Sequence, residues 1–370
     1  MRIVLWAPLP PPLGGIGVWT QDYLRNAHLA DLSVQLIDTS PGGERGKGQS
    51  QFVASRSLLA LSRLRELDRA LESRPVAAHL TTTWFWAAAR EAIALALCRR
   101  AQVPTLLHVR RGTALLVWLR QLRRPVRQAL LASLRQASAI AVLTPELEVW
   151  LQDALPSVPI LRLPQAVDTL RFQPVAIAVP SPCLRVLFVG LQCAAKGLPE
   201  LAAAILQTSD TELIVAGPPA DAPCADLLAL AQAGRLRQLG PVPPAAMAEV
   251  YQAADVFCLP SRDEGMPRTL LEAMACALPC VATPVGGVAE AVGDAALLAP
   301  IGDVAALAQA LARLRDDAAL RARLGAAAVA LVQERHSMAA VLRIYAGVYA
   351  GLRVGAVTQH HPSGSGPRPG

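Results

Sequence analysis

The chain has 370 residues, of which 53% are hydrophobic and 17% are charged, and its formal net charge is +7. This composition excludes an intrinsically disordered protein, and the length exceeds what one ordinary hydrophobic core holds, so we expect two domains. The seven cysteines are odd in number and lack metal-ligand spacing, which argues against disulfides and zinc and for a reducing, cytoplasmic compartment.

The first third of the chain alternates between strand and helix patterns. Residues 2–7 form an apolar strand pattern, and a Pro- and Gly-rich turn follows before a helical pattern begins at about Val18. Further strands are predicted at 76–81, 105–109 and 139–143. Such alternation is typical of a parallel, doubly wound domain.

Positive charge is concentrated in the N-terminal half. Residues 1–167 contain 20 Lys and Arg against 11 Asp and Glu, whereas residues 168–370 contain 15 against 17. Residues 92–145 contain nine arginines and no acidic residue. Within this stretch, residues 115–124 and 126–134 read as two basic amphipathic helices interrupted by Pro125.

Two interpretations of these basic helices remain open. They lie on an anionic membrane surface, or they are ordinary surface helices packed on a core. Arg90 and Glu91 interrupt the longest apolar stretch, residues 81–98, so no membrane span is predicted. Nucleic acid is disfavoured as a partner because aromatic residues make up only 4% of the chain and no nucleic-acid motif accompanies the charge.

A second alternating series follows a proline-containing linker at 168–183. Its predicted strands lie at 185–190, 212–217, 255–260 and 280–283. Two similar halves in tandem predict two lobes with a ligand-binding cleft between them. Near the C-terminus, residues 324–352 read as two helices split near His336 and Ser337, and residues 358–370 as a disordered tail.

Two carboxylates surround the helix that is predicted after the strand at 255–260. Glu264 lies in the polar loop, and Glu272 lies inside a helix whose first turn contains Pro267. Backbone N–H groups of that first turn, around residues 266–269, form an anion site. The eight-residue separation spans about 12 Å at helical rise, which is too far for a glycosidase pair. It suits one acid at a hexose and the other at a ribose, although a helix cap and a solvated acid fit the spacing equally well.

Residues 261–290 resemble the retaining nucleotide-sugar glycosyltransferases of the GT-B fold, family 4 (glycosyl transferases group 1). Ala277 stands where the family prefers Gly and Cys280 where it prefers Val. The positions that match the family pattern are Ser261, Glu264, Gly265, Pro267, Leu271, Glu272, Ala273, Met274, Ala275, Pro279, Val281, Ala282, Gly286, Gly287 and Glu290.

The resemblance implies an α/β fold of two Rossmann-like, doubly wound domains facing each other across a cleft. It implies an acceptor-side domain at 1–167, the linker at 168–183 and a nucleotide-sugar-binding domain at 184–336. A helix at 337–357 would return to the first domain, and the tail would follow.

Roles for single residues also come from the resemblance. Glu264 would contact the sugar hydroxyls and Glu272 the ribose, while Lys196 would bind the diphosphate. Leu191 replaces the arginine that the family places directly after the strand. The helix start would complete the diphosphate site through Gly265, Met266, Pro267, Arg268 and Thr269, of which Arg268 is a candidate substitute for the missing cation.

In the first domain, the resemblance points to Gly15 and His108. Gly15 belongs to a Gly-Gly-x-Gly turn that would approach the donor phosphate, although an ordinary βα turn has the same pattern. His108, at the carboxyl end of the strand at 105–109, would orient the donor sugar. The register could slip by two residues to Arg110, and a merely structural histidine is the alternative.

The implied activity is retaining transfer of a hexosyl group from a nucleoside-diphosphate sugar to an acceptor hydroxyl. No cofactor is expected, and no metal is expected because the chain has no Asp-x-Asp motif. The expected acceptor is a glycan or lipid-linked precursor of cell-surface polysaccharide or glycolipid, met in the cytoplasm or peripherally at the inner membrane face. Three alternatives stay open: a non-catalytic nucleotide-sugar-binding module, suggested by Leu191, a nucleotide-sugar epimerase, and an inverting transferase.

Overall fold

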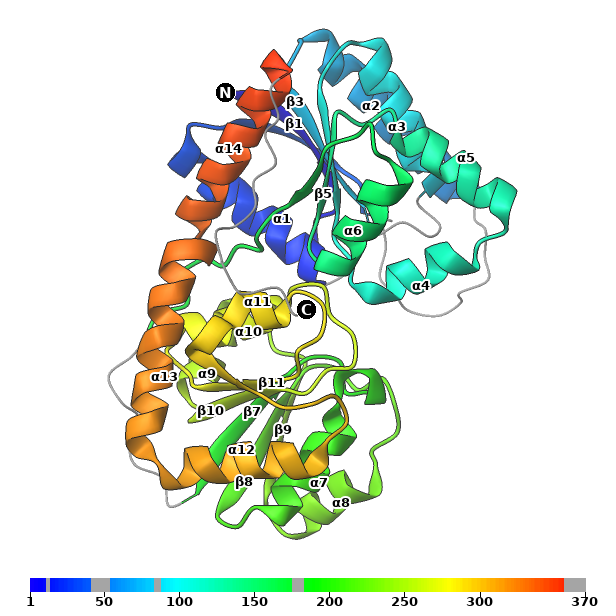
Figure 1. Cartoon of the computed structure of the whole chain (residues 1–370). Helices are drawn as coiled ribbons and strands as arrows, with labels where there is room; N and C mark the ends of the chain where they lie inside the picture. Colours follow the sequence, from blue (N-terminus) through cyan, green and yellow to red (C-terminus); the bar gives the residue numbers. More distant parts are fainter. Residues whose placement is uncertain (11–13, 41–53, 83–87, 175–182, 356–370) are drawn as a thin grey trace, which may run out of the picture. The chain divides into compact units, whose positions relative to one another are not determined.

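The computed structural model describes residues 1–10, 14–40, 54–82, 88–174 and 183–355. The chain divides into two compact units, each of which contains one six-stranded parallel sheet with helices around it (Figure 1). Unit 1 comprises Met1–Pro164 and Leu342–Gly370, and unit 2 comprises Gln165–Val341.

The sheet of unit 1 has the strand order β2-β1-β3-β4-β5-β6. Its strand order reverses at β1, which pairs with β2 on one side and β3 on the other. The carboxyl ends of β1 and β3 therefore flank a topological switch point. The strands are β1 (Arg2–Ala7), β2 (Ser33–Asp38), β3 (Ala77–Thr82), β4 (Thr105–Val109), β5 (Ala139–Val142) and β6 (Ile160–Arg162).

Helices cover both faces of this sheet (Figure 1). They are α1 (Gly15–Asn26), α2 (Ala54–Glu72), α3 (Ala88–Arg100), α4 (Thr113–Gln121), α5 (Arg124–Leu134), α6 (Pro145–Ala154) and the part of α14 (Met338–Val354) from Leu342 on, with a 3₁₀ segment, η1 (Ala27–Ala30), after α1.

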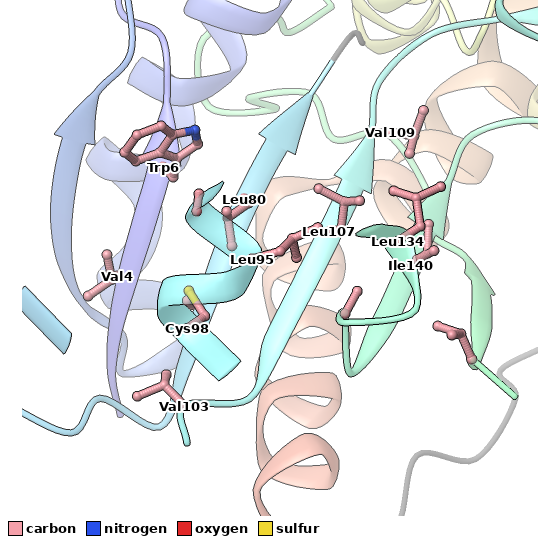
Figure 2. Packing of buried hydrophobic residues seen from close by; sticks show 14 of the residues in the cluster. Val4, Trp6, Leu80, Leu95, Cys98, Val103, Leu107, Val109, Leu134 and Ile140 are labelled. Atoms are coloured by element: carbon pink, nitrogen blue, oxygen red, sulfur yellow. The ribbon is translucent and has the colours of Figure 1, made fainter. Parts of the chain in front are cut away.

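The two faces of β4 differ in chemistry. Leu107 and Val109 point into an apolar cluster that also contains Leu95 and Cys98 of α3 (Figure 2). Because side chains alternate along a strand, His108 faces the opposite side, where it contacts aromatic rings of α1 and α14. One face of unit 1 is thus an ordinary hydrocarbon core, and the other contains buried polar rings.

Unit 2 has the strand order β12-β11-β10-β7-β8-β9, and its switch point lies between β7 and β10. Its strands are β7 (Leu184–Val189), β8 (Thr211–Ala216), β9 (Leu236–Gly240), β10 (Val256–Leu259), β11 (Cys280–Ala282) and β12 (Ala296–Leu298). Its helices are α7 (Leu198–Gln207), α8 (Ala225–Gln232), α9 (Met247–Gln252), α10 (Arg268–Ala275), α11 (Val288–Val292), α12 (Val304–Asp316) and α13 (Ala318–Leu331), with 3₁₀ segments η3 (Ala194–Lys196), η4 (Pro244–Ala246) and η5 (Gly293–Ala295).

The predicted α/β fold with two Rossmann-like domains is confirmed, and every predicted strand lies within one residue of an observed one. Four strands escaped prediction, β2, β6, β9 and β12. β6 and β12 have only three residues, and β2 and β9 are exposed or half-exposed along most of their length, so all four lack a long buried apolar run. The contacts divide the chain between Pro164 and Gln165, earlier than the predicted linker at 168, and residues 175–182 and 358–370 lie outside the described residues.

The prediction that Pro125 interrupts two basic helices was wrong. Pro125 lies in the first turn of α5, where its missing N–H costs nothing, and the break between the two helices lies two to three residues earlier, at Leu122 and Arg123. The apolar stripes of both helices pack into the core through Leu115, Leu119 and Leu134. The apolar faces of both helices are therefore buried against the core of unit 1.

The C-terminal helices split near the predicted position. A π-helical segment, η6 (Val332–His336), follows α13, and Ser337 is extended with φ −62° and ψ 147° before α14 begins. His336 is buried, and its Nδ1 lies 2.9 Å from the carbonyl oxygen of Gln165. This contact and the Val167–Ser337 bridge hold the end of unit 2 to its beginning.

Ala277, where the family prefers glycine, occupies the left-handed region with φ 61° at the end of α10. A Cβ there costs about 1–2 kcal/mol relative to glycine, partly offset by the greater unfolded-state entropy of glycine. We predict that Ala277→Gly raises the free energy of unfolding by about 0.5–1 kcal/mol in a denaturant titration.

Ala327→Gly is the matched control, because Ala327 is exposed within α13. Its substitution should lower the free energy of unfolding by about 1 kcal/mol. A loss of similar size in Ala277→Gly would contradict the strain that we assign to position 277.

Candidate functional site

Two loops meet at the switch point of unit 2. Because β7 and β10 are paired neighbours, the segments after their carboxyl ends lie side by side. The first loop ends in Lys196, and the second contains Glu264. Lys196 Nζ lies 2.7 Å from Glu264 Oε1, and the two side chains are 27% and 12% exposed. Two residues that the sequence assigns to different parts of a donor are thus joined as an ion pair.

A third side chain fixes the same carboxylate. Ser261 is buried, and its Oγ donates to Glu264 Oε1 at 2.8 Å. The Ser261 carbonyl oxygen accepts in turn from the Thr283 hydroxyl. Oε1 therefore receives an ammonium donor and a hydroxyl donor, which orients the carboxylate and leaves Oε2 for a further donor.

Glycines allow the loops to touch through their backbones. Gly197 has φ 71°, and a Cβ there would lie 1.9 Å from the carbonyl oxygen of Pro260. Gly286 has φ 54°, and a Cβ there would lie 2.1 Å from the carbonyl oxygen of Glu264. Any larger residue would push these loops apart and displace the ion pair.

Glu272 lies inside α10, as predicted, and is 7% exposed. Its Oε2 accepts from the Tyr251 hydroxyl at 2.9 Å, and Arg268 Nη2 lies 3.4 Å from Oε1. Burial, reinforced by the Glu272 charge, raises the pKa of Tyr251 well above its ordinary value, so this hydroxyl stays a donor. Both oxygens of Glu272 are held in place from within unit 2.

The start of α10 has the features of an anion site. Pro267 is the N-cap, no side chain caps the helix, and the first turn contains no acidic residue. The backbone N–H groups there stand at the positive end of the helix dipole, beside the guanidinium of Arg268. Met266 is buried and its Sδ accepts from the Gln165 N–H, so it supports the turn from within unit 2. Thr269 lies in the same turn and Gly265 lies in the loop two residues before the N-cap, and both are partly exposed.

A cavity of about 400 Å³ opens near the carboxyl ends of β7, β8 and β9. It borders the Lys196 loop through Gln192 and Cys193, but its lining does not include Lys196, Glu264 or Glu272. Among the described residues, no group of three or more His, Cys, Asp or Glu has an arrangement that could hold a metal ion.

Gly15 begins α1 in unit 1, next to the N-cap Gly14. A Cβ at either position would meet nothing within 4 Å. Packing within the described part of unit 1 therefore does not require glycine here. The predicted close approach of a ligand to Gly15 stays a prediction.

His108 lies within β4, one residue before its end, and its side chain is fully buried. Its Nδ1 is 3.2 Å from His79 Nε2 and 3.5 Å from Arg110 Nη1. Burial first, and then the Arg110 charge, lowers the pKa of His108 well below its ordinary value. Arg110, the alternative position from the sequence, stacks over the Trp19 ring with its Cζ 4.1 Å from the ring centroid. The donor-orienting role of His108 stays a prediction.

Three residues of these arrangements escaped sequence reasoning. In the sequence Ser261 is only a motif position, and Tyr251 and His79 belong to no motif. Tyr251 and His79 act through partners 21 and 29 residues away, respectively, which only the fold brings together. For Ser261, its place three residues before Glu264 was an available signal for a side-chain contact.

Residues 184–317 match the model of a protein family described as glycosyl transferases group 1. Part of the chain is similar to D-inositol 3-phosphate glycosyltransferase of Corynebacterium efficiens, with 43% identity over 97 residues, which are 26% of this chain and 23% of the relative. O-antigen chain mannosyltransferase B of Escherichia coli is 44% identical over 85 residues, which are 23% of this chain and 22% of that protein. The aligned segments thus span less than a quarter of these curated relatives.

Solved structures resemble nearly the whole chain. Sucrose-phosphate synthase from Thermosynechococcus elongatus superposes with a TM-score of 0.71 at 20% identity, covering 96% of this chain and 99% of that one. Anabaena HepE in complex with UDP and glucose has a TM-score of 0.68 at 17% identity, covering 94% and 98%. Residues 184–317 of unit 2 are thus similar to the glycosyl transferases group 1 family, and the chain has the GT-B fold of two Rossmann-like domains.

Proposed function

We propose that this protein is a retaining glycosyltransferase that moves a hexosyl group from a nucleoside-diphosphate sugar to an acceptor hydroxyl. The observation that carries the proposal is the Lys196–Glu264–Ser261 cluster, which lies at the switch point of a group 1 domain beside the uncapped start of α10. In parallel sheets, ligands bind at such switch points.

Each part of the donor has a matching group in unit 2. The diphosphate would bind Lys196 Nζ and the first-turn N–H groups of α10, with Arg268 as a further cation in place of the family arginine that Leu191 replaces. The sugar hydroxyls would donate to Glu264 and the ribose hydroxyls to Glu272. Because cations and helix N–H groups supply the positive charge, the proposal includes no metal.

The reaction would break the bond between the anomeric carbon and the phosphate oxygen and form one to the acceptor oxygen on the same face. The acceptor proton would pass to the departing phosphate. Negative charge develops on the leaving diphosphate in the transition state, and Lys196 with the start of α10 would stabilise it there. The two rivals that share the fold, an epimerase and a non-catalytic binding module, would give no such transfer product.

A donor screen tests the proposal. UDP-, GDP- and ADP-sugars are added to the protein, and the melting temperature and the sugar released or transferred are recorded. We expect one nucleotide class to raise the melting temperature by several degrees and Glu272→Ala to abolish that ligand-induced rise. The rise, rather than the absolute value, is the readout, because Tyr251 and Arg268 lose a buried partner in this variant.

Glu334→Ala, at a side chain 72% exposed in unit 2, is the control for the loss of one carboxylate. An undiminished rise in Glu272→Ala would remove Glu272 from the donor site. Nuclear magnetic resonance of the product then assigns the anomer: retention is expected, and inversion would refute that part of the proposal.

Ser261→Ala separates sugar binding from nucleotide binding. Loss of a hydrogen bond to a charged group costs about 1.5–3 kcal/mol, so we expect KM for the nucleotide sugar to rise at least about tenfold. Inhibition by the free nucleoside diphosphate should stay unchanged, because Ser261 acts only through Glu264. Ser209→Ala, at an exposed site of unit 2, is the control. Equal weakening of nucleotide and nucleotide sugar would contradict this role.

For the acceptor, we propose a glycan or lipid-linked precursor of cell-surface polysaccharide or glycolipid, with unit 1 in peripheral contact with an anionic membrane. In the described part of the chain, no helix is long and apolar enough to cross a membrane. The basic corner of α4 and α5, defined here by Arg120, Arg123 and Arg124, has all three side chains exposed. Val117 and Val126 beside it are 54% and 52% exposed. Since the leucine stripes are used in the core, the contact would be mainly electrostatic.

Liposome binding tests this contact. With vesicles that contain phosphatidylserine at low salt, neutralising the three arginines of the basic corner to Gln should weaken binding about 100-fold, because each contributes about 1 kcal/mol at an anionic surface. High salt should have a similar effect.

Gln at Arg65, Arg69 and Arg99 is the matched control, since these are three exposed arginines elsewhere in unit 1. Equal losses in the two triple variants, or no vesicle binding by the unmodified protein, would refute the membrane proposal. Tighter binding to single-stranded RNA than to vesicles would point to nucleic acid instead.

A further inference from the structure

We propose that His79 and Tyr349 are positioning residues that fix the tautomer of His108, so that His108 offers a buried Nε2–H to an oxygen of the substrate. The inference rests on the proposed function through the role of His108. It adds to that function a hydrogen-bond relay inside unit 1 that involves two histidines and two tyrosines.

The relay consists of side chains from four elements. The Tyr23 hydroxyl of α1 lies 2.9 Å from the Tyr349 hydroxyl of α14, and the Tyr349 hydroxyl lies 2.6 Å from His79 Nδ1 on β3. His79 Nε2 lies 3.2 Å from His108 Nδ1 on β4. All four side chains have no exposed surface. The contacts form one unbranched line from Tyr23 to His108.

Arg110 determines the direction of the line. Its Nη1 lies 3.5 Å from His108 Nδ1, and a guanidinium donates hydrogen bonds but cannot accept them. His108 Nδ1 must therefore be an acceptor, which places the His108 proton on Nε2. His79 Nε2 then donates to His108, and His79 Nδ1 accepts from Tyr349. Tyr349 in turn accepts from Tyr23, so every donor of the line points towards His108.

The rings are neutral at ordinary pH. Burial, reinforced by the Arg110 charge, lowers the pKa of His79 to about 3 and that of His108 well below its usual value. Burial also raises the pKa of Tyr349 well above its usual value. The titratable and charged groups that face the two imidazoles are Tyr23, Tyr345, Tyr349 and Arg110. The relay therefore fixes which nitrogen of each imidazole carries the proton, while both imidazoles stay neutral.

Aromatic packing prevents His108 from turning away. The His108 ring stacks on His79 with centroids 5.4 Å apart, and it meets Trp19 and Tyr345 edge-on at 6.0 Å each. With the ring held in place, its hydrogen-bond partners select which nitrogen carries the proton.

One donor of the line has no acceptor. His108 Nε2 is buried and has no hydrogen-bond partner among the described residues. Native proteins leave few buried polar groups unsatisfied, and a functional role is one explanation for such a group. A hydroxyl or phosphate oxygen of the substrate would complete the series, in accord with the predicted contact of His108 with the donor sugar. A neutral N–H contributes a hydrogen bond there and transfers no proton.

Nitrogen-15 spectra of the histidines in the full-length protein test the relay directly. We expect both His79 and His108 to be neutral Nε2–H tautomers between pH 5.5 and pH 8. Tyr349→Phe removes the donor to His79 Nδ1, so His79 should become a mixture of tautomers and kcat/KM should fall about tenfold, as for the loss of one hydrogen bond. Assignment of His108 as the Nδ1–H tautomer in the unmodified protein would overturn the proposal.

Thr105→Val is the matched control, because it removes one buried hydroxyl from β4, where the Thr105 hydroxyl donates to the Val103 carbonyl oxygen and takes no part in the relay. Its histidine spectra and kcat/KM should stay close to those of the unmodified protein. Equal losses in Thr105→Val and Tyr349→Phe would show that Tyr349 acts only through packing and would overturn its positioning role. If the protein proved to transfer no sugar, the spectra would still report the tautomers, so failure of the proposed function is distinguishable from failure of the relay.

Discussion

The ion pair between Lys196 and Glu264 depends on the pairing of two parallel strands and, in turn, organises the site around it. β7 and β10 are neighbours only because the strand order of unit 2 reverses between them. That reversal brings residues 68 positions apart to within 2.7 Å. Gly197 and Gly286 make the approach possible, since a Cβ on either would collide with a backbone carbonyl oxygen. A carboxylate and an ammonium thus stand side by side at the start of a helix, which suits a ligand with hydroxyls next to a diphosphate.

The two units use buried polar groups differently. In unit 2, donors converge on carboxylates: Lys196 and Ser261 on Glu264, Tyr251 and Arg268 on Glu272. These hydrogen bonds and ion pairs orient the two carboxylates before any ligand arrives. In unit 1, neutral side-chain rings form a series of hydrogen bonds, and the guanidinium of Arg110 sets the direction of that series. In each unit, the polar groups are thus oriented before a ligand binds.

The spacing of apolar residues along the sequence predicted those features of the structure that depend on residues close together in the chain. Glu264 in a loop and Glu272 in a helix followed from Pro267 and the apolar positions around it, and the structure agrees. The predicted helix break at Pro125 was wrong because proline, which disrupts the interior of a helix, fits well in its first turn. The pairing of Lys196 with Glu264 and of Tyr251 with Glu272 was beyond prediction, since each joins segments that only strand order and helix packing bring together. The contact between His108 and His79 was beyond prediction for the same reason. The sequence around each histidine does not indicate which face of the sheet packs against aromatic rings.

The central claim is that the start of α10, Lys196 and the two glutamates of unit 2 bind an activated sugar. A crystal structure with a nucleoside-diphosphate sugar bound tests it most directly. The account predicts diphosphate oxygens within hydrogen-bond distance of Lys196 Nζ and of the first-turn N–H groups of α10, sugar hydroxyls on Glu264 and ribose hydroxyls on Glu272. A ligand bound elsewhere in unit 2, with Lys196 still paired only to Glu264, would contradict it.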